Sequence, residues 1–552
     1  MAKPARCVYI LVMRTVLCCL IGVLLLACQQ NEADRETELP PPGEAVLFDN
    51  LVLSTPLKSY NHHNPIMTQN FGADPNVLEW DGRLYVYMTA DSLTDTSLPP
   101  SGQTGPNDYG YIKSLRVLST SDLVNWTQHP ELKISEISGT SSYISNLWAP
   151  APAVKDSGAG RKIFLYFSNS GGGTGVISAD HPLGPWTSPR SSNIITSSTP
   201  NMAGVPNPFD PAVLVDDDGR AYLYVGGGTP PGGTLVDGTY PYFDSNHPNP
   251  DNIRAVELNA DMVSINGTPV KITLPFTFEA SEINKINGRY YYSYSSNPQV
   301  NHYATRPDQF PAAVVLGDTM SIGYAVSDNP LGPYELQGAI LHNPGKMFSL
   351  PYNNNHHKMF MFKGKWFVAY HTKLLMSALN NVAGMNINLS ERNYRSVNID
   401  AVTVSADGKI GLITGTRDGV TQLGTFNPYR AVSAATMGVM AGISTVEYQP
   451  ETGQRAMKVT NINSGDWIAL YGVNFDSPGA KTFFCRVTPP ADVGVIQIKL
   501  DSPDGKPVGY AVINPGHEEI TANLLSTITG VHDLVLIFYG NGYDLEEWQF
   551  FH

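Results

Sequence analysis

Five copies of one strand–turn–strand pattern constrain the fold of this chain more than any other feature. The first copy opens at Ala73-Asp74-Pro75, turns at Asp81-Gly82 and continues as an alternating strand to Met88. Each copy is expected to form a β-hairpin, because alternating apolar residues flank a turn. The other copies open at Trp148, Asp210, Glu279 and His356-His357.

The spacing of these copies predicts how the hairpins are organised. Consecutive copies begin 62 to 77 residues apart, which fits one blade of about four strands, so five copies predict a five-bladed β-propeller over residues 59–424. A second phrase at residues 178–186 is echoed at 327–334, with a shorter form at 121–126. The alternative is an irregular β-sandwich with chance similarity between segments.

The periodic phrase stops near residue 425, and a different pattern follows. Short alternating strands at residues 466–470, 483–487, 496–500 and 534–538 predict a separate β-sandwich, of jelly-roll type, over residues 425–552. The 28 Tyr, 50 Gly and 42 Pro of the chain also favour strands and turns. The expected fold class is therefore all-β.

The N-terminus has the layout of an export signal. Lys3, Arg6 and Arg14 precede an apolar run over residues 17–26, too short to span a bilayer. Leu26-Ala27-Cys28 resembles the lipobox of bacterial lipoproteins, so residues 1–27 are expected to be removed and Cys28 to be lipidated. Residues 28–58 are acidic and proline-rich, as in an extended tether. These features predict an exported, outer membrane-associated lipoprotein, periplasmic or at the cell surface; the alternative is an ordinary cleaved signal.

Charge and cysteine content exclude several classes of function. Removal of Lys3, Arg6 and Arg14 takes the net charge from −14 to about −17, which disfavours nucleic acid as a partner. Only Cys485 remains after export and lipidation, so neither a disulfide framework nor a catalytic cysteine is expected. No obligate protein partner is evident.

The residues that open the copies suggest a chemistry. In a propeller, the first strand of each blade starts near the central axis, so Asp74, Asp210 and Glu279 would share one funnel. Hydrolysis of a glycosidic bond needs two carboxyl groups, and a third can tune the proton affinity of the acid. The alternative is that an Asp before Pro only caps a strand or a turn.

The segment from about residue 59 to 420 resembles glycoside hydrolase family 43. The motifs that carry this resemblance are Ala73-Asp74-Pro75, Phe209-Asp210-Pro211, Phe278-Glu279-Ala280-Ser281, Asn354-Asn355-His356-His357 and Tyr394-Arg395-Ser396-Val397. The resemblance implies that Asp74 is the general base, that Asp210 modulates the pKa and orients the acid, and that Glu279 is the general acid. Glu282 is a rival acid, but its odd offset from Glu279 along a strand would point it to the other face.

The resemblance also implies substrate and metal contacts. Trp148 and Phe209 would line the sugar site and Arg395 would donate to sugar hydroxyls; otherwise, Trp148 is core packing and Arg395 a surface strand residue. Asn398 stands where the family usually has histidine, which leaves the neighbouring contacts open. His356 and His357 resemble the position beside a hydrated calcium ion; alternatively, they are core histidines. No cofactor is expected for the chemistry.

The C-terminal segment resembles a family 6 carbohydrate-binding module. The matching phrases lie at residues 463–468, 499–503 and 530–534. The acidic Glu-x-Glu that usually opens such a module and supplies calcium ligands is replaced by Val432-Ser433-Ala434. Sugar binding is therefore implied, while a role as packing support for the propeller stays open.

Together, these features predict an inverting exo-glycosidase that acts on plant cell-wall polysaccharide or its oligosaccharides, with α-L-arabinofuranosidase as the leading activity. A β-xylosidase or a galactan-cleaving enzyme on the same scaffold is the alternative. A non-catalytic carbohydrate-binding lipoprotein is the alternative from another class, but binding alone needs no acid and base pair. Inversion is expected because Asp74 and Glu279 come from separate hairpins, which leaves room for a water molecule.

Overall fold

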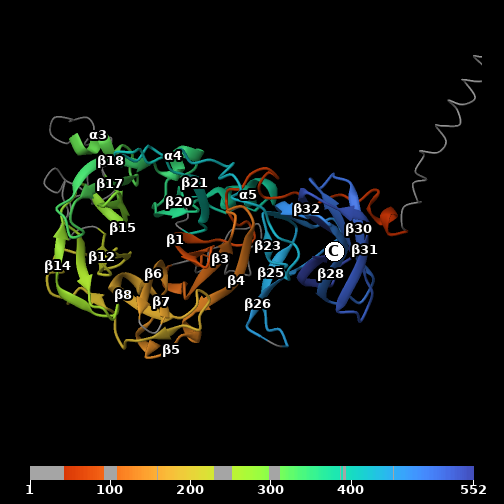
Figure 1. Ribbon diagram of the computed structural model, residues 1–552. Coiled ribbons are helices and arrows are strands. Elements are labelled where there is room, and N and C mark those ends of the chain that lie inside the picture. The colour runs from red at the N-terminus through yellow and green to blue at the C-terminus, as the bar shows by residue number, and fades with distance from the viewer. Residues whose placement is uncertain are drawn as a thin grey trace, which may run out of the picture. The chain divides into compact units, whose positions relative to one another are not determined.

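The computed structural model describes residues 43–91, 109–157, 160–228, 251–297, 311–385, 387–389, 393–451 and 453–552. These residues form an all-β fold, as predicted (Figure 1). Residues 52–552 make up one compact unit, and the short 3-10 helix η1 (Gly43–Phe48) belongs to a separate N-terminal unit. The predicted signal segment and Cys28 lie outside the described residues. Within the described part of the chain, no helix has the length and apolar content needed to cross a membrane.

Five sheets follow one another along the first four hundred residues, and each contains one of the predicted hairpins. The first sheet contains β1 (Ala73–Trp80), β2 (Arg83–Thr89), β3 (Ser114–Thr120) and β4 (Trp126–Lys133). The second contains β5 (Ser138–Gly139), β6 (Trp148–Ser157), β7 (Gly160–Ser168), β8 (Gly173–Ala179), β9 (Thr187–Ser188) and β10 (Ile195–Thr196). The third contains β11 (Ala212–Val215), β12 (Ala221–Gly226), β13 (Ile253–Leu258) and β14 (Ile265–Ile272).

The fourth and fifth sheets complete this series. The fourth contains β15 (Thr277–Ile286), β16 (Arg289–Ser296), β17 (Ile322–Ser327) and β18 (Glu335–Leu341). The fifth contains β19 (His357–Phe362), β20 (Lys365–Thr372) and β21 (Ser396–Ala401). Short helices lie in the connections: η2 (Tyr109–Tyr111), η3 (Ile134–Glu136), η4 (Ser141–Tyr143), η5 (Ser170–Gly172), α3 (Pro311–Leu316), α4 (Pro344–Phe348) and α5 (Leu374–Val382).

The turns of the hairpins explain why these segments fold back on themselves. Asp81-Gly82, Asn287-Gly288 and Lys363-Gly364 each place two consecutive residues at positive φ, between 47° and 79°. A two-residue turn of this kind matches the twist of antiparallel strands, and glycine at its second position adopts it without steric cost. The predicted hairpins are confirmed by the pairing of β1 with β2, β15 with β16 and β19 with β20.

The second repeated phrase has a defined structural place. It follows the third long strand of a sheet, after β8 at residue 179 and after β17 at residue 327. In both copies a proline carbonyl accepts a hydrogen bond from a buried tyrosine of the preceding sheet: Tyr87 donates to Pro182 at 2.7 Å, and Tyr224 to Pro330 at 2.6 Å. The phrase therefore links neighbouring sheets.

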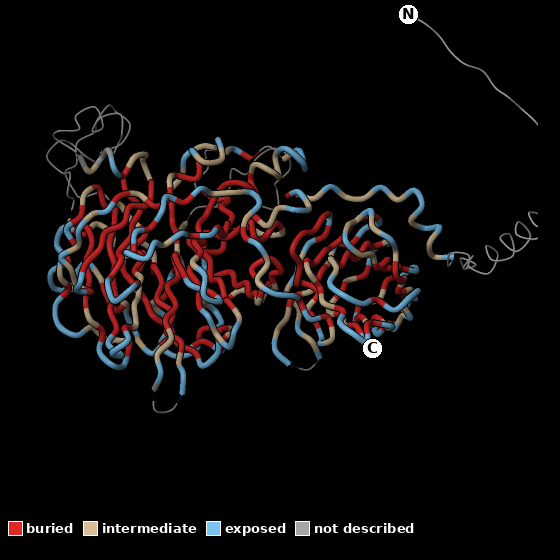
Figure 2. The backbone as a smooth tube through the Cα atoms, turned by 45° about the horizontal axis from the view of Figure 1, so that its top comes forward, coloured by how far each residue is buried: buried red, intermediate tan, exposed pale blue. Residues whose placement is uncertain are grey.

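Five hydrophobic cores join the five sheets in pairs, and Figure 2 shows how the buried stretches run through the strands while the turns stay exposed. Each core contains residues of two neighbouring sheets, such as Tyr87 and Leu165, Tyr166 and Leu223, Tyr224 and Tyr292, Tyr291 and Val368, and Phe367 and Val86. The first strands β1, β6, β11, β15 and β19 contact one another in the same order. Contacts thus pass from each sheet to the next and return from the fifth to the first.

Two further sheets form the C-terminal part, around a separate core that includes Trp548, Ile496 and Phe483. One contains β25 (Ser444–Tyr448), β26 (Ala456–Thr460), β33 (Asp544–Phe551), β28 (Ala480–Thr488), β31 (Glu519–Ile528) and β22 (Val432–Ser433). The other contains β24 (Val439–Ala441), β27 (Trp467–Asn474), β32 (Val531–Tyr539), β29 (Gly494–Leu500) and β30 (Pro507–Ile513).

The C-terminal part also extends the first sheet. Strand β23 (Thr436–Met437) pairs antiparallel with β4, so the outer edge of the first sheet is hydrogen-bonded rather than open. Lys133 of β4 forms an ion pair with Glu447 of β25 at 2.7 Å. The residues expected to end the tether also make contacts here: Ser54 accepts a hydrogen bond at its carbonyl from Trp467 Nε1 at 3.0 Å, and its hydroxyl donates to Asp466 at 2.6 Å.

Candidate active site

The three predicted carboxyl groups lie together, where the first strands of three sheets begin. Asp74 lies in β1, Asp210 stands two residues before β11 and Glu279 lies in β15. Asp210 Oδ2 accepts a hydrogen bond from the backbone N–H of Ala280 at 3.1 Å. His356 Nδ1 lies 3.6 Å from Asp74 Oδ1 and 3.9 Å from Asp210 Oδ2. The sequence prediction that these groups converge is therefore confirmed in their geometry.

A left-handed residue interrupts each of these strand starts. Asp74 and Asp210 have φ values of 48° and 49°, and Ala149 and Ala280 take 41° and 61° at the corresponding points of the second and fourth sheets. Non-glycine residues rarely adopt this conformation, and it is concentrated at functional sites.

In the first, second and fourth sheets the strand pairing shifts register at the same points, which marks a β-bulge. Ala280 is consequently the structural counterpart of Asp74 and Asp210, and Glu279 stands one position earlier, level with Phe209 and Trp148. The five sequence copies, in contrast, place Glu279 at the position of the two aspartates. The difference of one residue means that Glu279 reaches the site from a different backbone position.

Asp74 is buried, and both its carboxylate oxygens and its backbone N–H are hydrogen-bonded. Its Oδ1 accepts a hydrogen bond from Arg395 Nη1 at 2.8 Å, and its Oδ2 accepts one from the Thr89 hydroxyl at 2.7 Å. Its backbone N–H donates to His371 Nδ1 at 3.1 Å. Burial alone would raise the pKa of Asp74, but the Arg395 guanidinium, together with His371 and His356, outweighs burial and holds this pKa below its usual range. Asp74 is therefore suited to act as an ionised base.

Asp210 is held by Ser168 and Ala280. Its backbone N–H donates to the Ser168 hydroxyl at 2.8 Å, and that hydroxyl donates to Asp210 Oδ1 at 3.1 Å. Burial raises the pKa of Asp210, His356 opposes this effect, and the negative charge of Asp74 adds to it. A carboxyl group so placed contributes negative charge beside Glu279.

Glu279 has the opposite protonation behaviour from Asp74. Burial and then the negative charges of Asp210 and Asp74 raise its pKa well above the usual range, while a hydrogen bond from Asn354 opposes this shift. A carboxyl group kept protonated in this way can donate a proton at neutral pH. Two carboxyl groups whose surroundings push their pKa values apart are suited to acid and base roles.

Glu282, the rival acid, is committed elsewhere. Its carboxylate forms an ion pair with Lys358, and Asn76 donates to it at 3.5 Å. The odd-offset argument against Glu282 does not hold, because the bulge lets Glu279 pair with Ser295 and Glu282 with Ser293, two residues apart on the same strand. Its ion pair, not its strand face, separates Glu282 from the role of acid.

The surroundings of Arg395 exclude one of its two sequence-based alternatives. Its side chain is 1% exposed, so it is no surface residue. Three of the five N–H groups of its guanidinium are used by carboxylates: Nη1 by Asp74, and Nε and Nη2 by Asp91 at 2.8 and 2.9 Å. The ring of Tyr109 lies 5.5 Å from the guanidinium carbon. Few donors therefore remain for sugar hydroxyls, and that role stays a prediction.

Aromatic side chains lie near the carboxyl groups, and the sugar-contact role of Trp148 and Phe209 stays a prediction. The rings of Trp148 and Tyr109 lie 5.8 Å apart, and Trp148 is half-buried. Phe209 lies against Gly227, where an added Cβ would come within 2.7 Å of the Phe209 ring and 3.1 Å of the Glu279 Cα. Glycine at position 227 thus allows Phe209 to pack beside the backbone of Glu279.

The side chains of His356 and His357 offer nitrogen atoms, not oxygen atoms, as ligands for a metal. Burial lowers the pKa of His356 and of His357, so both rings are neutral. His357 Nε2 hydrogen-bonds the Ser293 hydroxyl at 2.6 Å, and its Nδ1 is buried without a protein partner. Among the described residues, no three His, Cys, Asp or Glu side chains gather in a way that could hold a metal. Since calcium prefers six to eight oxygen ligands, these residues fit only an ion that keeps most of its water.

Several residues of the site were not found from the sequence. Asp91, Thr89, Ser168, Tyr109, Asn354 and His371 all contact the predicted groups. Thr89 and Asp91 lie two residues apart at the end of the first predicted hairpin. Polar residues at the end of a strand that pairs with a candidate acid could therefore have been identified as site residues. The remaining contacts depend on which sheets are neighbours.

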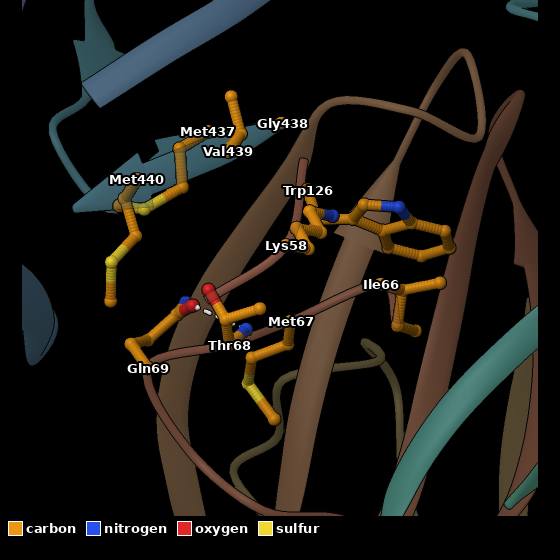
Figure 3. Close-up of a pocket in the computed structure, with 10 residues that line it drawn as sticks. All are labelled: Lys58, Ile66, Met67, Thr68, Gln69, Trp126, Met437, Gly438, Val439 and Met440. Atoms are coloured by element: carbon orange, nitrogen blue, oxygen red, sulfur yellow. Dashed lines mark hydrogen bonds between the residues drawn. The ribbon is translucent and has the colours of Figure 1, made fainter. Parts of the chain in front are cut away.

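A pocket lies away from the carboxyl groups, between residues 66–69 and residues 437–440 (Figure 3). Lys58 and Trp126 also line it. Burial lowers the pKa of Lys58 to about 7, and its ammonium donates to the carbonyls of Pro65 and His63 at 2.8 and 3.2 Å. This pocket contains none of the predicted site residues.

Paired carboxyl groups of opposite protonation behaviour, with aromatic rings nearby, define a site of the kind that glycoside hydrolases use. The model of the family "Glycosyl hydrolases family 43" matches residues 62–410, and that of "Carbohydrate binding module (family 6)" matches residues 433–552. The chain therefore belongs to glycosyl hydrolase family 43 and carries a family 6 carbohydrate-binding module.

Relatives resemble the chain over most of its length. An arabinoxylan arabinofuranohydrolase from Paenibacillus polymyxa is 39% identical over 506 residues, covering 88% of this chain and 74% of that protein. One from Bacillus subtilis (strain 168) is 36% identical, covering 90% and 94%. The crystal structure of a family 43 arabinoxylan arabinofuranohydrolase from Bacillus subtilis, in complex with cellotetraose, is 35% identical, has a TM-score of 0.77 and is covered over 99% of its length.

Proposed function

We propose that this protein is an exo-acting α-L-arabinofuranosidase that removes arabinose side chains from arabinoxylan, a plant cell-wall polysaccharide, and from its oligosaccharides. The observation that carries the proposal is the 36–39% identity to two arabinoxylan arabinofuranohydrolases across 88–90% of this chain. The three carboxyl groups stand in the family motif positions and have the environments that such hydrolysis needs.

The reaction proposed is a single displacement with inversion. Asp74, held ionised, takes a proton from a water molecule that attacks the anomeric carbon, while Glu279 gives its proton to the leaving oxygen. Asp210 keeps Glu279 protonated through its negative charge. Asp74 belongs to the first sheet and Glu279 to the fourth, and this favours the wider separation of about 6.5 to 9.5 Å that seats a water molecule.

We propose that the five sheets are the blades of a β-propeller over residues 59–424. The supporting observations are the five cores that link successive sheets and the contact of β19 with β1. The two C-terminal sheets around Trp548 are proposed to be a β-sandwich over residues 425–552. Its family supports sugar binding, and its pairing with β4 supports a structural role as well.

We further propose that the protein is an exported lipoprotein of the outer membrane, lipidated at Cys28 after removal of residues 1–27 and tethered by residues 28–58. The Leu26-Ala27-Cys28 sequence supports this proposal. In a bacterial host, the wild-type protein is expected in the membrane fraction and Cys28→Ser in the soluble fraction. Wild-type protein that is soluble and carries no lipid by mass spectrometry would contradict the anchor.

A structural calcium ion is proposed beside His356 and His357, held largely through water. The unpartnered Nδ1 of His357 supports it. Such an ion would add positive charge near these histidines and has no step in the reaction. Metal analysis of purified protein, with thermal unfolding before and after chelation, tests this; an absence of bound calcium and an unchanged unfolding midpoint would refute it.

A panel of substrates tests the proposed activity. Nitrophenyl arabinofuranoside, xyloside, galactoside and galactofuranoside are compared with arabinoxylan, and the sugar released is identified. Arabinose from arabinoxylan and preference for the arabinofuranoside are expected. Release of xylose or galactose would replace the substrate assignment, and release of no sugar would favour the non-catalytic lipoprotein.

A further inference from the structure

Asp91 is a buried carboxylate that contacts the candidate base only through another residue. It directly follows the first hairpin, two positions after Thr89, and is 0% exposed. We propose that Asp91 is a positioning residue, which holds Arg395 so that the guanidinium presents one N–H to Asp74 and fixes the orientation of that base. This inference rests on the proposed role of Asp74.

The hydrogen bonds of Arg395 are divided unequally between the two carboxylates. Asp91 accepts from Nε and Nη2 in the paired, bidentate geometry, and its Oδ2 also accepts from the backbone N–H of Arg395 at 3.0 Å. Asp74 accepts a single bond, from Nη1. A bidentate pair fixes the plane of a guanidinium as well as its position. Arg395 therefore cannot turn to grip Asp74 with both nitrogens while Asp91 is in place.

This division of bonds leaves Asp74 constrained but available. Its Oδ1 accepts one hydrogen bond from Arg395 and its Oδ2 accepts one from Thr89. His371 Nδ1 and His356 Nδ1 also lie 3.2 and 3.6 Å from Oδ1, but His371 Nδ1 is the acceptor of the Asp74 backbone N–H. Each carboxylate oxygen therefore keeps a lone pair. Thr89 and Asp91 lie two residues apart. Thr89 holds Asp74 directly, and Asp91 holds it through Arg395. The orientation of Asp74 is thus fixed while its carboxylate keeps the capacity to accept a proton from water.

A role in fold stability alone does not account for this arrangement. A single buried guanidinium faces two buried carboxylates, and a buried ion network contributes little to stability compared with apolar packing of the same volume. The network also joins the end of the first hairpin to the residue that precedes β21, which places it between the first and fifth sheets at the site itself.

The test is a double-mutant cycle in the full-length protein, with nitrophenyl arabinofuranoside and an arabinoxylan oligosaccharide as substrates. Asp91→Asn keeps the shape and removes the charge. We expect a loss in kcat of about 10- to 100-fold, of equal size on both substrates, since water activation is needed whatever the leaving group. In Asp74→Asn/Asp91→Asn, no loss beyond that of Asp74→Asn is expected, because Asp91 acts through Asp74.

Controls separate positioning from folding. Arg395→Lys keeps the charge but cannot bind both carboxylates, so it should show the same lack of additivity with Asp74→Asn. Asp400→Asn alters a buried carboxylate of β21 that bonds Tyr370 and Thr416, away from Asp74; its effect on activity should be small and should multiply with that of Asp74→Asn. Thermal unfolding is measured for all variants.

Two outcomes are distinguishable. Wild-type kcat in Asp91→Asn, or losses that multiply in the double variants of both Asp91 and Arg395, would overturn the positioning role while leaving the proposed function intact. Full activity in Asp74→Asn itself would overturn the proposed function. If Asp91→Asn does not fold, Arg395→Lys decides the question by the same criterion.

Discussion

Opposite protonation behaviour of two carboxyl groups is the central feature at the scale of residues. Asp74 lies against Arg395 at 2.8 Å, whereas Glu279 faces the negative charges of Asp210 and Asp74. Burial acts on both groups in the same direction, so the neighbouring charges decide which is ionised. The pair therefore divides into a base and an acid without needing different residue types.

Loss of the acid should depend on the leaving group. Glu279→Ala is expected to lose about 10²- to 10⁴-fold in kcat/KM on arabinoxylan oligosaccharides, but far less on nitrophenyl arabinofuranoside, since an acidic phenol departs without a proton. Steady-state kinetics on the two substrates measure the difference. Equal losses on both substrates would remove Glu279 from the role of acid.

The charge of Asp210 should be visible in the pH profile. Activity requires protonated Glu279, so kcat/KM falls as the pH rises through the pKa of Glu279. Asp210→Asn removes a negative charge that raises this pKa, and the alkaline limb should therefore move to lower pH. A profile of kcat/KM against pH for both proteins checks this, and an unmoved or higher limb would show that Asp210 does not set the proton affinity of Glu279.

At the scale of elements, β-bulges shape the strand starts that carry the site, since the pairing of the first hairpin shifts register in the first, second and fourth sheets. Left-handed residues at 74, 149, 210 and 280 recur at the same point of four sheets. Two of them are alanines, which gain nothing from side-chain hydrogen bonds and prefer other backbone conformations. The conformation is therefore imposed by the site rather than by local preference.

Substitution at Ala280 tests that conformation. Ala280→Gly should unfold at a temperature equal to or above that of the wild type, since glycine has no Cβ to strain at φ 61°. Ala280→Val should lower the unfolding temperature, because its Cβ substituents reduce the free energy of unfolding by roughly 1–3 kcal/mol. It should also reduce kcat by displacing the neighbouring Glu279. Differential scanning calorimetry and kinetics compare the three proteins. Equal stability of the valine and glycine variants would contradict the left-handed assignment.

The sequence predicted the elements better than the contacts between them. Alternation and turn residues located the hairpins, and the residues that open them located Asp74, Asp210 and Glu279. The bulge could not be predicted, because alanine, which stands at positions 149 and 280, is not a residue type that favours turns. The prediction that Glu279 and Glu282 lie on opposite strand faces was wrong for this reason. Asp91 was missed because its partner Arg395 lies about three hundred residues away and only the neighbouring sheets bring the two together.

At the scale of the whole molecule, the C-terminal part completes the first sheet. Strand β23 pairs with β4, the Lys133–Glu447 ion pair lies beside this contact, and Asn125 exchanges hydrogen bonds with the backbone of Tyr471 at 2.8 Å. Without these residues, β4 would present an open edge, and open edges promote aggregation. The two parts of the chain are thus expected to depend on each other for stability.

Calorimetry tests this dependence. The full chain is expected to unfold in one transition, and a protein truncated after residue 432 is expected to unfold at a lower temperature or to aggregate. The control is Phe551→Ala, which shortens an exposed side chain of the C-terminal sheet far from β4 pairing and should leave a single transition. The prediction would be contradicted if the full chain unfolded in two well-separated transitions and the truncated protein unfolded at the temperature of the first of them.

The configuration of the first sugar released tests the account most directly, since it depends on the substrate, on the acid and on the base together. Proton NMR during hydrolysis of an α-L-arabinofuranoside should show β-L-arabinofuranose first, before mutarotation mixes the anomers. Added alcohols should give no transglycosylation product. First-formed α-L-arabinofuranose, or a sugar ester trapped on Asp74, would contradict the proposed division of roles between Asp74 and Glu279.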